Sequence, residues 1–144
     1  MKVPAASSPD ALRRMRRQGQ RDTKPEMALR RELHRIGLRY RVNRPVLPGV
    51  RRRADVVFTP ARVAVFVDGC FWHGCPSHGT RPKANADWWA AKLAGNVARD
   101  RDTDARLDAA GWRVVRVWEH EDMRAAAGNV RSILEGSRTP NRPR

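Results

Sequence analysis

The chain is 144 residues long, which suits one domain of common size and argues against a repeat array or two separate cores. Thirty Lys and Arg residues against fifteen Asp and Glu give a net charge of +15, so we expect a polyanionic partner. DNA or RNA fits this charge, and an anionic membrane surface is the alternative. The longest unbroken aliphatic or aromatic run, residues 63–67, is too short to cross a bilayer or to form a signal-peptide core, so we expect a cytoplasmic protein.

The positive charge is concentrated toward the amino terminus. Residues 1–53 carry sixteen Lys and Arg against four Asp and Glu, whereas residues 54–144 carry fourteen against eleven. The amino-terminal third is therefore the part of the chain that electrostatics would draw first to a nucleic acid.

Both ends of the chain are predicted to be flexible. The first segment lacks apolar periodicity and has four arginines around Met15, two of which are Arg16 and Arg17, so we expect it to order on phosphates; a solubility tail is the alternative. The carboxy-terminal segment contains two prolines and more arginine. The predicted organisation is a flexible basic arm at 1–20, a folded domain at 21–136 and a flexible basic tail at 137–144.

The first half of the domain is predicted to form a helix and three strands. Thr23 followed three residues later by Glu26 is a capping box that starts a helix, and Gly37 ends it. Alternating apolar residues predict a strand over 38–42, and a second strand covers 54–58. The continuous branched run at 63–67 predicts a strand buried on both faces in the centre of a sheet.

The second half adds a long helix, a strand and a last helix. Asn85 or Asp87 can start the long helix, which runs to Ala110. A strand over 112–118 and a helix over 121–134 follow. This order predicts an α/β fold with a mixed sheet and helices on its faces, in which the crossover helix makes the last two strands parallel.

The spacing of cysteines and histidines predicts a structural zinc site. Cys70 and Cys75 have four residues between them and His78 follows after two more, so one loop can wrap a tetrahedral ion. His120 is the best candidate for the fourth ligand, because the two central strands would bring their carboxyl ends together. Four protein ligands make a closed, structural site. The alternative is two buried thiols and two surface histidines.

A second group of residues is suited to hydrolysis. His73 lies inside the wrapped loop, where a neutral imidazole could take a proton from water; a satisfied or solvent-facing histidine is the alternative. Asp55 lies in an otherwise apolar strand, where its charge needs compensation, and Mg²⁺ is the natural hard cation. Asp68 ends the neighbouring strand and could approach the same ion or orient His73. The structural alternatives are a salt bridge from Asp55 to an arginine at 51–53 and a turn-forming role for Asp68.

Two further acids are less certain on spacing alone, and three aromatic residues are candidates for DNA contact. Spacing alone favours helix capping over catalysis for Glu26. Asp100 lies on the inward stripe of the long helix, where the loop histidine or a metal-bound water would be its partner. Phe71 and Trp72 in the glycine-bearing loop, together with Trp89 near the start of the long helix, could wedge between base pairs; core packing is the alternative.

Five sequence segments occur in order between about Met15 and Glu121. They are RDTKPE at 21–26, PGVRRRADVVF at 48–58, VFVDGCFWHGCP at 65–76, NVARD at 96–100 and GWRVVRVWE at 111–119. Together they resemble the very-short-patch repair (Vsr) DNA mismatch endonucleases. The resemblance implies a restriction-endonuclease-like three-layer fold and a magnesium-dependent nick on the 5′ side of the thymine in a T:G mismatch, which arises when 5-methylcytosine deaminates.

The resemblance also implies roles for single residues. By position, Asp55 looks like the family's magnesium-binding aspartate, His73 like its catalytic histidine and Asp100 like the acid that supports that histidine. Glu26 looks like the glutamate that holds a metal-bound water, so it would cap the helix and act in catalysis together. The family inserts aromatic residues beside the mismatch at positions that correspond to Phe71, Trp72 and Trp89, and Met15 resembles a residue that intercalates from the other groove.

The resemblance supports the zinc site, but the chain departs from some members at three places. It has Val67-Asp68 where those members have Thr-His, so the role of Asp68 rests on its own chemistry. It has His120 where they use cysteine, and Cys75 with His78 replaces a different histidine and cysteine spacing. We expect a monomer in the bacterial cytoplasm, associated with the nucleoid, that acts on double-stranded DNA and can meet other repair proteins. The remaining alternatives are a related nuclease for other modified DNA and a non-catalytic, zinc-stabilised DNA-binding module.

Overall fold

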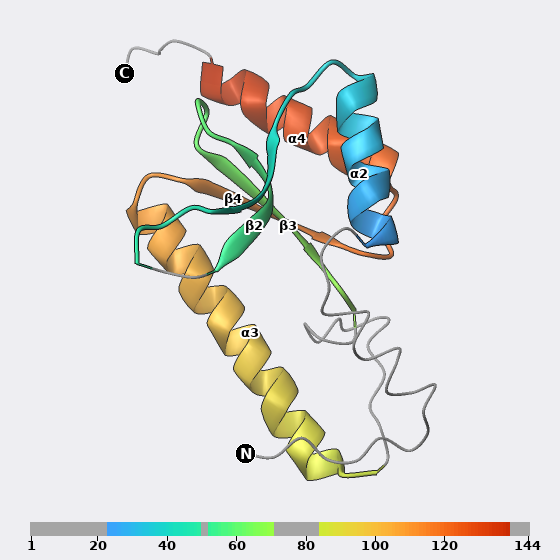
Figure 1. Cartoon of the computed structure of the whole chain (residues 1–144), viewed down its shortest axis with the longest axis vertical. Coiled ribbons are helices and arrows are strands. Elements are labelled where there is room, and N and C mark those ends of the chain that lie inside the picture. Colours follow the sequence, from blue (N-terminus) through green and yellow to red (C-terminus); the bar gives the residue numbers. More distant parts are fainter. Residues whose placement is uncertain (1–22, 50–51, 71–83, 139–144) are drawn as a thin grey trace.

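The computed structural model describes residues 23–49, 52–70 and 84–138 (Figure 1). The helices and strands are, in chain order, α2 (Lys24–Arg35), β1 (Arg41–Pro45), β2 (Arg53–Phe58), β3 (Val63–Asp68), α3 (Ala86–Ala109), β4 (Arg113–Trp118) and α4 (Met123–Arg138). This confirms the predicted α/β class and the predicted order of elements. Within the described ranges, no helix is long and apolar enough to cross a membrane.

The four strands form one mixed sheet in the order β1-β2-β3-β4. β1 pairs antiparallel with β2, and β2 pairs antiparallel with β3. β3 and β4 are parallel, as a crossover through α3 requires. All residues of β3 except Val67 are buried, which confirms the prediction of a central strand.

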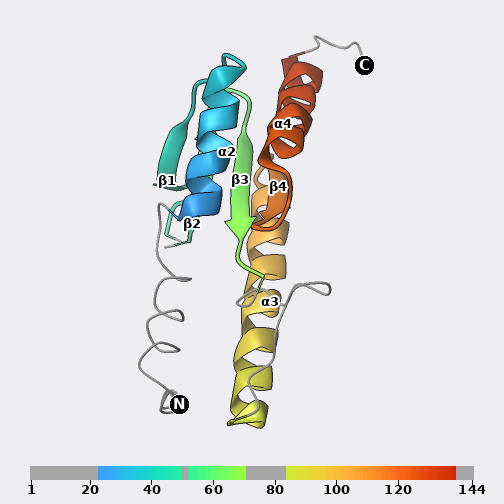
Figure 2. The same cartoon turned by 90° about the vertical axis from the view of Figure 1, so that its right-hand side faces the viewer.

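The helices cover the two faces of this sheet in three layers (Figures 1 and 2). α2 and α4 pack together on one face, where Leu29 and Val130 are fully buried against strand side chains such as Val65. α3 covers the other face through Leu107, which packs with Phe66 and its neighbours. The amino-terminal half of α3 continues well past the end of the strands (Figure 1). The architecture is consistent with the restriction-endonuclease-like fold that the sequence predicts.

The first strand begins three residues later than predicted. Leu38 and Tyr40 pack against the core as their alternation indicates, but they do so before the backbone pairs with β2. The hydroxyl of Tyr40 donates to the carbonyl oxygen of Arg30 at 2.9 Å, and its ring meets Phe58 edge-on. Tyr40 therefore ties the connection to α2, and pairing starts at Arg41.

The helix ends follow the predicted signals in part. The Thr23 hydroxyl accepts the backbone N–H of Glu26 at 3.4 Å, and Gly37 follows α2 with a φ of +90° that suits glycine. Asn85 precedes α3 as predicted, but it has left-handed backbone angles and its side chain makes no capping bond. α4 starts at Met123, two residues later than predicted, because Asp122 caps it: the carboxylate of Asp122 accepts the backbone N–H of Arg124 at 3.0 Å, and its carbonyl oxygen accepts that of Ala126.

Candidate active site

Three acidic side chains gather where β2 begins, β3 ends and α2 begins. Asp55 lies on β2, and its Oδ2 accepts the backbone N–H of Val67 on β3 at 2.7 Å. Asp68, the last residue of β3, is only 5% exposed, and Glu26 in the first turn of α2 is only 4% exposed. The antiparallel β2–β3 pairing is what brings residues 55 and 68 to one end of the sheet.

The environment of Asp55 opposes its negative charge. Burial is the main cause, and the charges of Glu26 and Asp68 add to it, so the pKa of Asp55 is raised to about 7. The bond from Val67 and the charge of Arg30 act in the opposite direction without cancelling the effect. A carboxyl group that resists ionisation beside other acids has a strong electrostatic reason to bind a cation.

Glu26 is turned into the fold and pairs with an arginine of its own helix. Its Oε2 lies 3.2 Å from Nη2 of Arg30, and both side chains are largely buried. The backbone N–H of Glu26 is bound by Thr23, so the capping role predicted for this segment is present on the backbone side. The charge of the side chain acts on Asp55 and raises the pKa of that carboxyl group.

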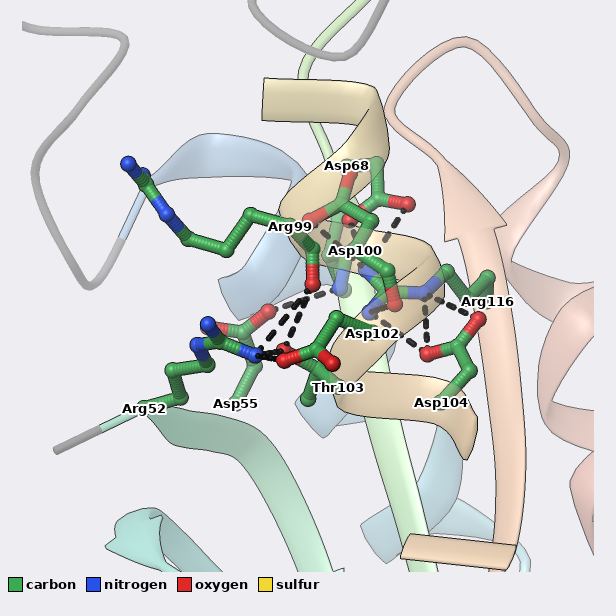
Figure 3. A network of polar contacts seen from close by, with 10 residues as sticks. Arg52, Asp55, Asp68, Arg99, Asp100, Asp102, Thr103, Asp104 and Arg116 are labelled. Atoms are coloured by element: carbon green, nitrogen blue, oxygen red, sulfur yellow. Dashed lines mark hydrogen bonds and ion pairs between the residues drawn. The ribbon is translucent and has the colours of Figure 1, made fainter. Parts of the chain in front are cut away.

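A second acidic group surrounds Arg116 on β4 (Figure 3). The guanidinium contacts Asp68 at 3.0 Å, Asp104 at 2.7 Å and Asp100 at 3.6 Å. Burial acts to lower the pKa of Arg116, but the bond to Asp104 and the charges of all three acids outweigh it and raise the pKa. Asp100 is thus directed inward as predicted, and it contacts an arginine in the described part of the chain. The predicted partner His73 lies outside the described residues.

The two described arginines at the start of β2 are not bonded to Asp55. Arg52 extends to α3, where its Nη1 bonds Asp102 Oδ2 and Thr103 Oγ1, each at 2.7 Å. Arg53 donates to the backbone carbonyl of Asn43. The salt-bridge alternative for Asp55 is therefore wrong for these two arginines, and residue 51 lies outside the described ranges.

Cys70 and His120 lie together, as the zinc prediction requires. The Sγ of Cys70 is 3.2 Å from Nδ1 of His120. Two ligands of one tetrahedral zinc ion would be separated by roughly 3.5 Å, given ordinary Zn–S and Zn–N lengths. Cys75 and His78 fall outside the described residues. Among the residues that are described, no three His, Cys, Asp or Glu side chains group closely enough to hold a metal ion, so neither the zinc prediction nor the magnesium prediction has a complete set of ligands in the described part of the chain.

The predicted DNA-contacting residues are largely untested. Trp89 is buried and meets Trp88 edge-on at a centroid distance of 4.8 Å, an arrangement that suits the packing alternative. Six further residues that were predicted to act in catalysis or to contact DNA lie outside the described ranges: Met15, Arg16, Arg17, Phe71, Trp72 and His73.

Sequence reasoning did not identify Arg116 or Arg30. The available signal lay in α3 and not in the strand of Arg116: Asp100 and Asp104 stand four residues apart on one helix face, where two acids would be expected to have a basic partner. The charge of Arg30 is placed by the same helical spacing, four residues after Glu26.

Comparison with known proteins places the chain in a family. Residues 10–78 match the family described as DNA mismatch endonuclease Vsr. The type II nicking enzyme V.NaeI of Lentzea aerocolonigenes is 46% identical over 133 residues, which cover 91% of this chain and 80% of that protein. The chain belongs to the Vsr family. It is therefore a DNA endonuclease, a hydrolase that acts on DNA.

Two further members show the range of the family. The type II nicking enzyme V.XorIIP of Xanthomonas oryzae pv. oryzae is 45% identical over 123 residues, covering 81% of this chain and 86% of that protein. The DNA mismatch endonuclease Vsr of Escherichia coli K12 is 40% identical over 106 residues, which cover 73% of this chain and 66% of that protein. The assignment as an endonuclease excludes the alternative of a non-catalytic DNA-binding module.

Proposed function

We propose that this Vsr-family endonuclease nicks one strand of duplex DNA on the 5′ side of the thymine in a T:G mismatch, in the very-short-patch repair of deaminated 5-methylcytosine. The observation that carries the chemistry is the buried Asp55, whose charge is opposed by its surroundings at the end of the sheet. The family match at residues 10–78 supports the mismatch substrate.

The residues at this end of the sheet fit a magnesium ion. Mg²⁺ prefers carboxylate oxygens and commonly takes one or two of them from the protein. Asp55 supplies such oxygens, and Glu26 would hold a water bound to the ion. The pKa of Asp55 is raised mainly by burial and further by the charge of Glu26, and a bound cation would oppose both effects. The carboxylate of Asp68 is already bonded to Arg116 through both oxygens, which favours a supporting role for it. A magnesium ion bound there would supply positive charge to neutralise the scissile phosphate and the departing 3′ oxygen.

The chain's own residues have separate roles in the proposed hydrolysis. Asp55 binds the cation and Glu26 orients the water beside it. His73 removes the proton from the attacking water, and Asp100 together with Asp68 holds the imidazole in a productive orientation. One catalytic centre in a monomer accounts for a cut in one strand.

We further propose a structural zinc ion on Cys70, Cys75, His78 and His120. The 3.2 Å approach of Cys70 Sγ to His120 Nδ1 supports it, because the two residues come from segments fifty positions apart. Such an ion would fix the loop that carries His73 against the end of β4. We place the enzyme in the bacterial cytoplasm, with double-stranded DNA of the nucleoid as its partner.

A second candidate substrate is suggested by the relatives. Proteins named type II nicking enzymes match this chain over as much as 91% of its length, which leaves open a nuclease for another modified or sequence-defined duplex. That alternative keeps the same catalytic residues and changes only the DNA that is recognised.

The test compares nicking on three duplexes of one sequence: a T:G mismatch, the matched C:G pair and the matched pair with 5-methylcytosine. We expect nicking of the T:G duplex alone, with Mg²⁺, and loss of rate by about a hundredfold or more in Asp55→Asn and in His73→Ala. Binding to the T:G duplex stays within about threefold in both variants, because neither side chain supplies the phosphate contacts that dominate affinity. Equal cutting of matched and mismatched duplexes would refute the substrate assignment.

The control variant is Asp102→Asn, which removes an acid of α3 that pairs with Arg52 and Arg106 and is not among the groups that shift the pKa of Asp55. Its nicking rate is expected to match that of the wild type. A comparable loss of rate in Asp102→Asn and Asp55→Asn would contradict the central role of Asp55.

A further inference from the structure

Arg116 links two elements that carry acids of the candidate site. In the parallel β3–β4 pair it stands opposite Phe66, so both side chains extend toward α3, and its guanidinium lies 4.2 Å over the Phe66 ring. From there it reaches Asp68 at the end of β3 and two acids of α3, Asp100 and Asp104. Figure 3 shows the three carboxylates arranged around this one side chain.

The contacts restrict the orientation of Asp68 in particular. Nη1 of Arg116 bonds both Oδ1 and Oδ2 of Asp68, at 3.0 and 3.2 Å. The Asp68 side chain is 8% exposed, so little water can compete for these bonds. The same guanidinium contacts Asp100 through its carboxylate and through its backbone carbonyl oxygen. One planar group therefore fixes two acids that come from different elements.

The acids at this end of the sheet are thereby divided into two groups. Asp68, Asp100 and Asp104 share the charge of Arg116, which is built into the fold. Asp55, in contrast, accepts a backbone N–H and has no arginine bonded to it among the described residues. The charges of the first three acids are compensated by an arginine of the protein, whereas Asp55 is the acid that would bind a cation from solution.

We propose that Arg116 is a positioning residue of the nicking reaction. It binds both Asp68 and Asp100 and thereby holds the two carboxylates in the orientation that the reaction requires. The inference rests on the proposed roles of these two acids and on the endonuclease activity, but not on the T:G substrate. Arg116 acts through the two acids, so its loss affects the rate of the chemical step. Binding of DNA and of Mg²⁺ remains, since these depend on other side chains.

The test uses two variants. Arg116→Met keeps an apolar stem over Phe66 without the charge, and Arg116→Lys keeps a positive charge without the planar guanidinium that bonds several carboxylates at once. Arg113→Met is the matched control, because Arg113 is exposed at the start of the same strand. The measurements are single-turnover nicking at saturating enzyme and Mg²⁺, affinity for uncut duplex, Mg²⁺ binding by calorimetry and thermal melting. The duplex is whichever one the wild type nicks, so a wrong T:G assignment leaves this test intact.

We expect the single-turnover rate of Arg116→Met to fall about tenfold or more, because a displaced catalytic group commonly costs this much. Affinities for DNA and Mg²⁺ stay within about threefold, Arg116→Lys is intermediate and Arg113→Met equals the wild type. A rate within about threefold of the wild type would overturn the proposal, and so would a parallel loss of rate, DNA affinity and Mg²⁺ binding.

If Arg116→Met does not fold, Arg116→Lys decides. A rate about threefold or more below the wild type at an unchanged melting temperature supports positioning by the guanidinium. A wild-type rate in Arg116→Lys would show that any positive charge at this place suffices, and this result would overturn the proposal that the guanidinium positions the two acids.

Discussion

At the scale of single residues, Asp55 is the side chain whose ionisation the fold opposes most clearly. Burial and the charges of Glu26 and Asp68 raise its pKa to about 7, from an ordinary value near 3.8. The folded protein thus binds a proton at Asp55 more tightly than the unfolded chain does. Without metal, the stabilisation from this group is complete below about pH 4 and is lost as the pH rises through 7.

The metal-free protein should therefore become less stable between pH 4 and pH 8, and Asp55→Asn should remove this part of the decline. Three pKa units correspond to about 4 kcal/mol at most, and partial exposure of Asp55 reduces the expected difference at pH 8 to about 2 kcal/mol in favour of Asp55→Asn. Denaturant-induced unfolding, followed in the presence of a metal chelator, measures this difference in the free energy of unfolding. Added Mg²⁺ at pH 8 should stabilise the wild type and leave Asp55→Asn unchanged.

Asp102→Asn is the control for this pH dependence. The hydrogen bond from Arg52 lowers the pKa of Asp102, so its contribution is present above its ordinary pKa and is lost only in more acid solution. Its pH profile between 4 and 8 should therefore parallel that of the wild type. A profile of Asp55→Asn that also parallels the wild type over this range would contradict the raised pKa of Asp55.

Single residues were predictable from the sequence where their chemistry was out of place. Asp55 stood out because it interrupts an apolar strand, and Asp100 because it falls on the inward stripe of a helix. Arg116 did not stand out, because an arginine in an alternating strand is ordinary on a solvated face. Its importance depends on which helix covers that face of the sheet, and that is a property of the tertiary fold.

At the scale of elements, the parallel β3–β4 pair continues beyond its last residues. The backbone N–H of Glu119 donates to the carbonyl oxygen of Asp68 at 2.9 Å, and Cys70 and His120 meet directly beyond this bond. The two strand ends are thus joined by backbone and side chain together. A zinc ion at this place would hold the segment after β3 to the segment after β4.

This arrangement predicts that His120→Ala loses zinc and stability together. Purified wild type should contain about one zinc per chain by elemental analysis, with a strongly reduced content in His120→Ala and a melting temperature lowered by several degrees. The control is His34→Ala, an exposed histidine of α2. Full zinc content in His120→Ala would remove this residue from the ligand set.

The elements themselves were mostly predictable, and the exceptions have a physical cause. The buried run of β3 and the stop signals around α2 and α3 gave the right types and order. The first strand was predicted three residues too early, because the alternation of apolar and polar residues indicates which side chains are buried but not where backbone pairing begins. Leu38 and Tyr40 are buried against α2 and the core, while the hydrogen bonds to β2 begin only at Arg41.

At the scale of the whole molecule, charge and fold have different distributions along the chain. The acids of the candidate site belong to the folded domain, whereas residues 1–20 contain five Lys and Arg against one Asp. Phosphate neutralisation releases counterions, so a basic arm contributes to affinity in a salt-dependent way that does not depend on sequence. Recognition of a mismatch requires contacts of another kind, to bases or to the distorted stack.

Replacing Arg13, Arg14, Arg16 and Arg17 with glutamine should therefore weaken binding to matched and mismatched duplexes alike. If all four arginines contact phosphates, we expect the slope of log affinity against log salt concentration to become less negative by about 3.6, since each phosphate contact contributes about 0.9. Met15→Ala keeps the charge and should leave this slope unchanged while it lowers the preference for T:G over matched DNA. An unchanged slope in the four-glutamine variant would identify the arm as a solubility tail, and the net charge of the chain would then need another explanation.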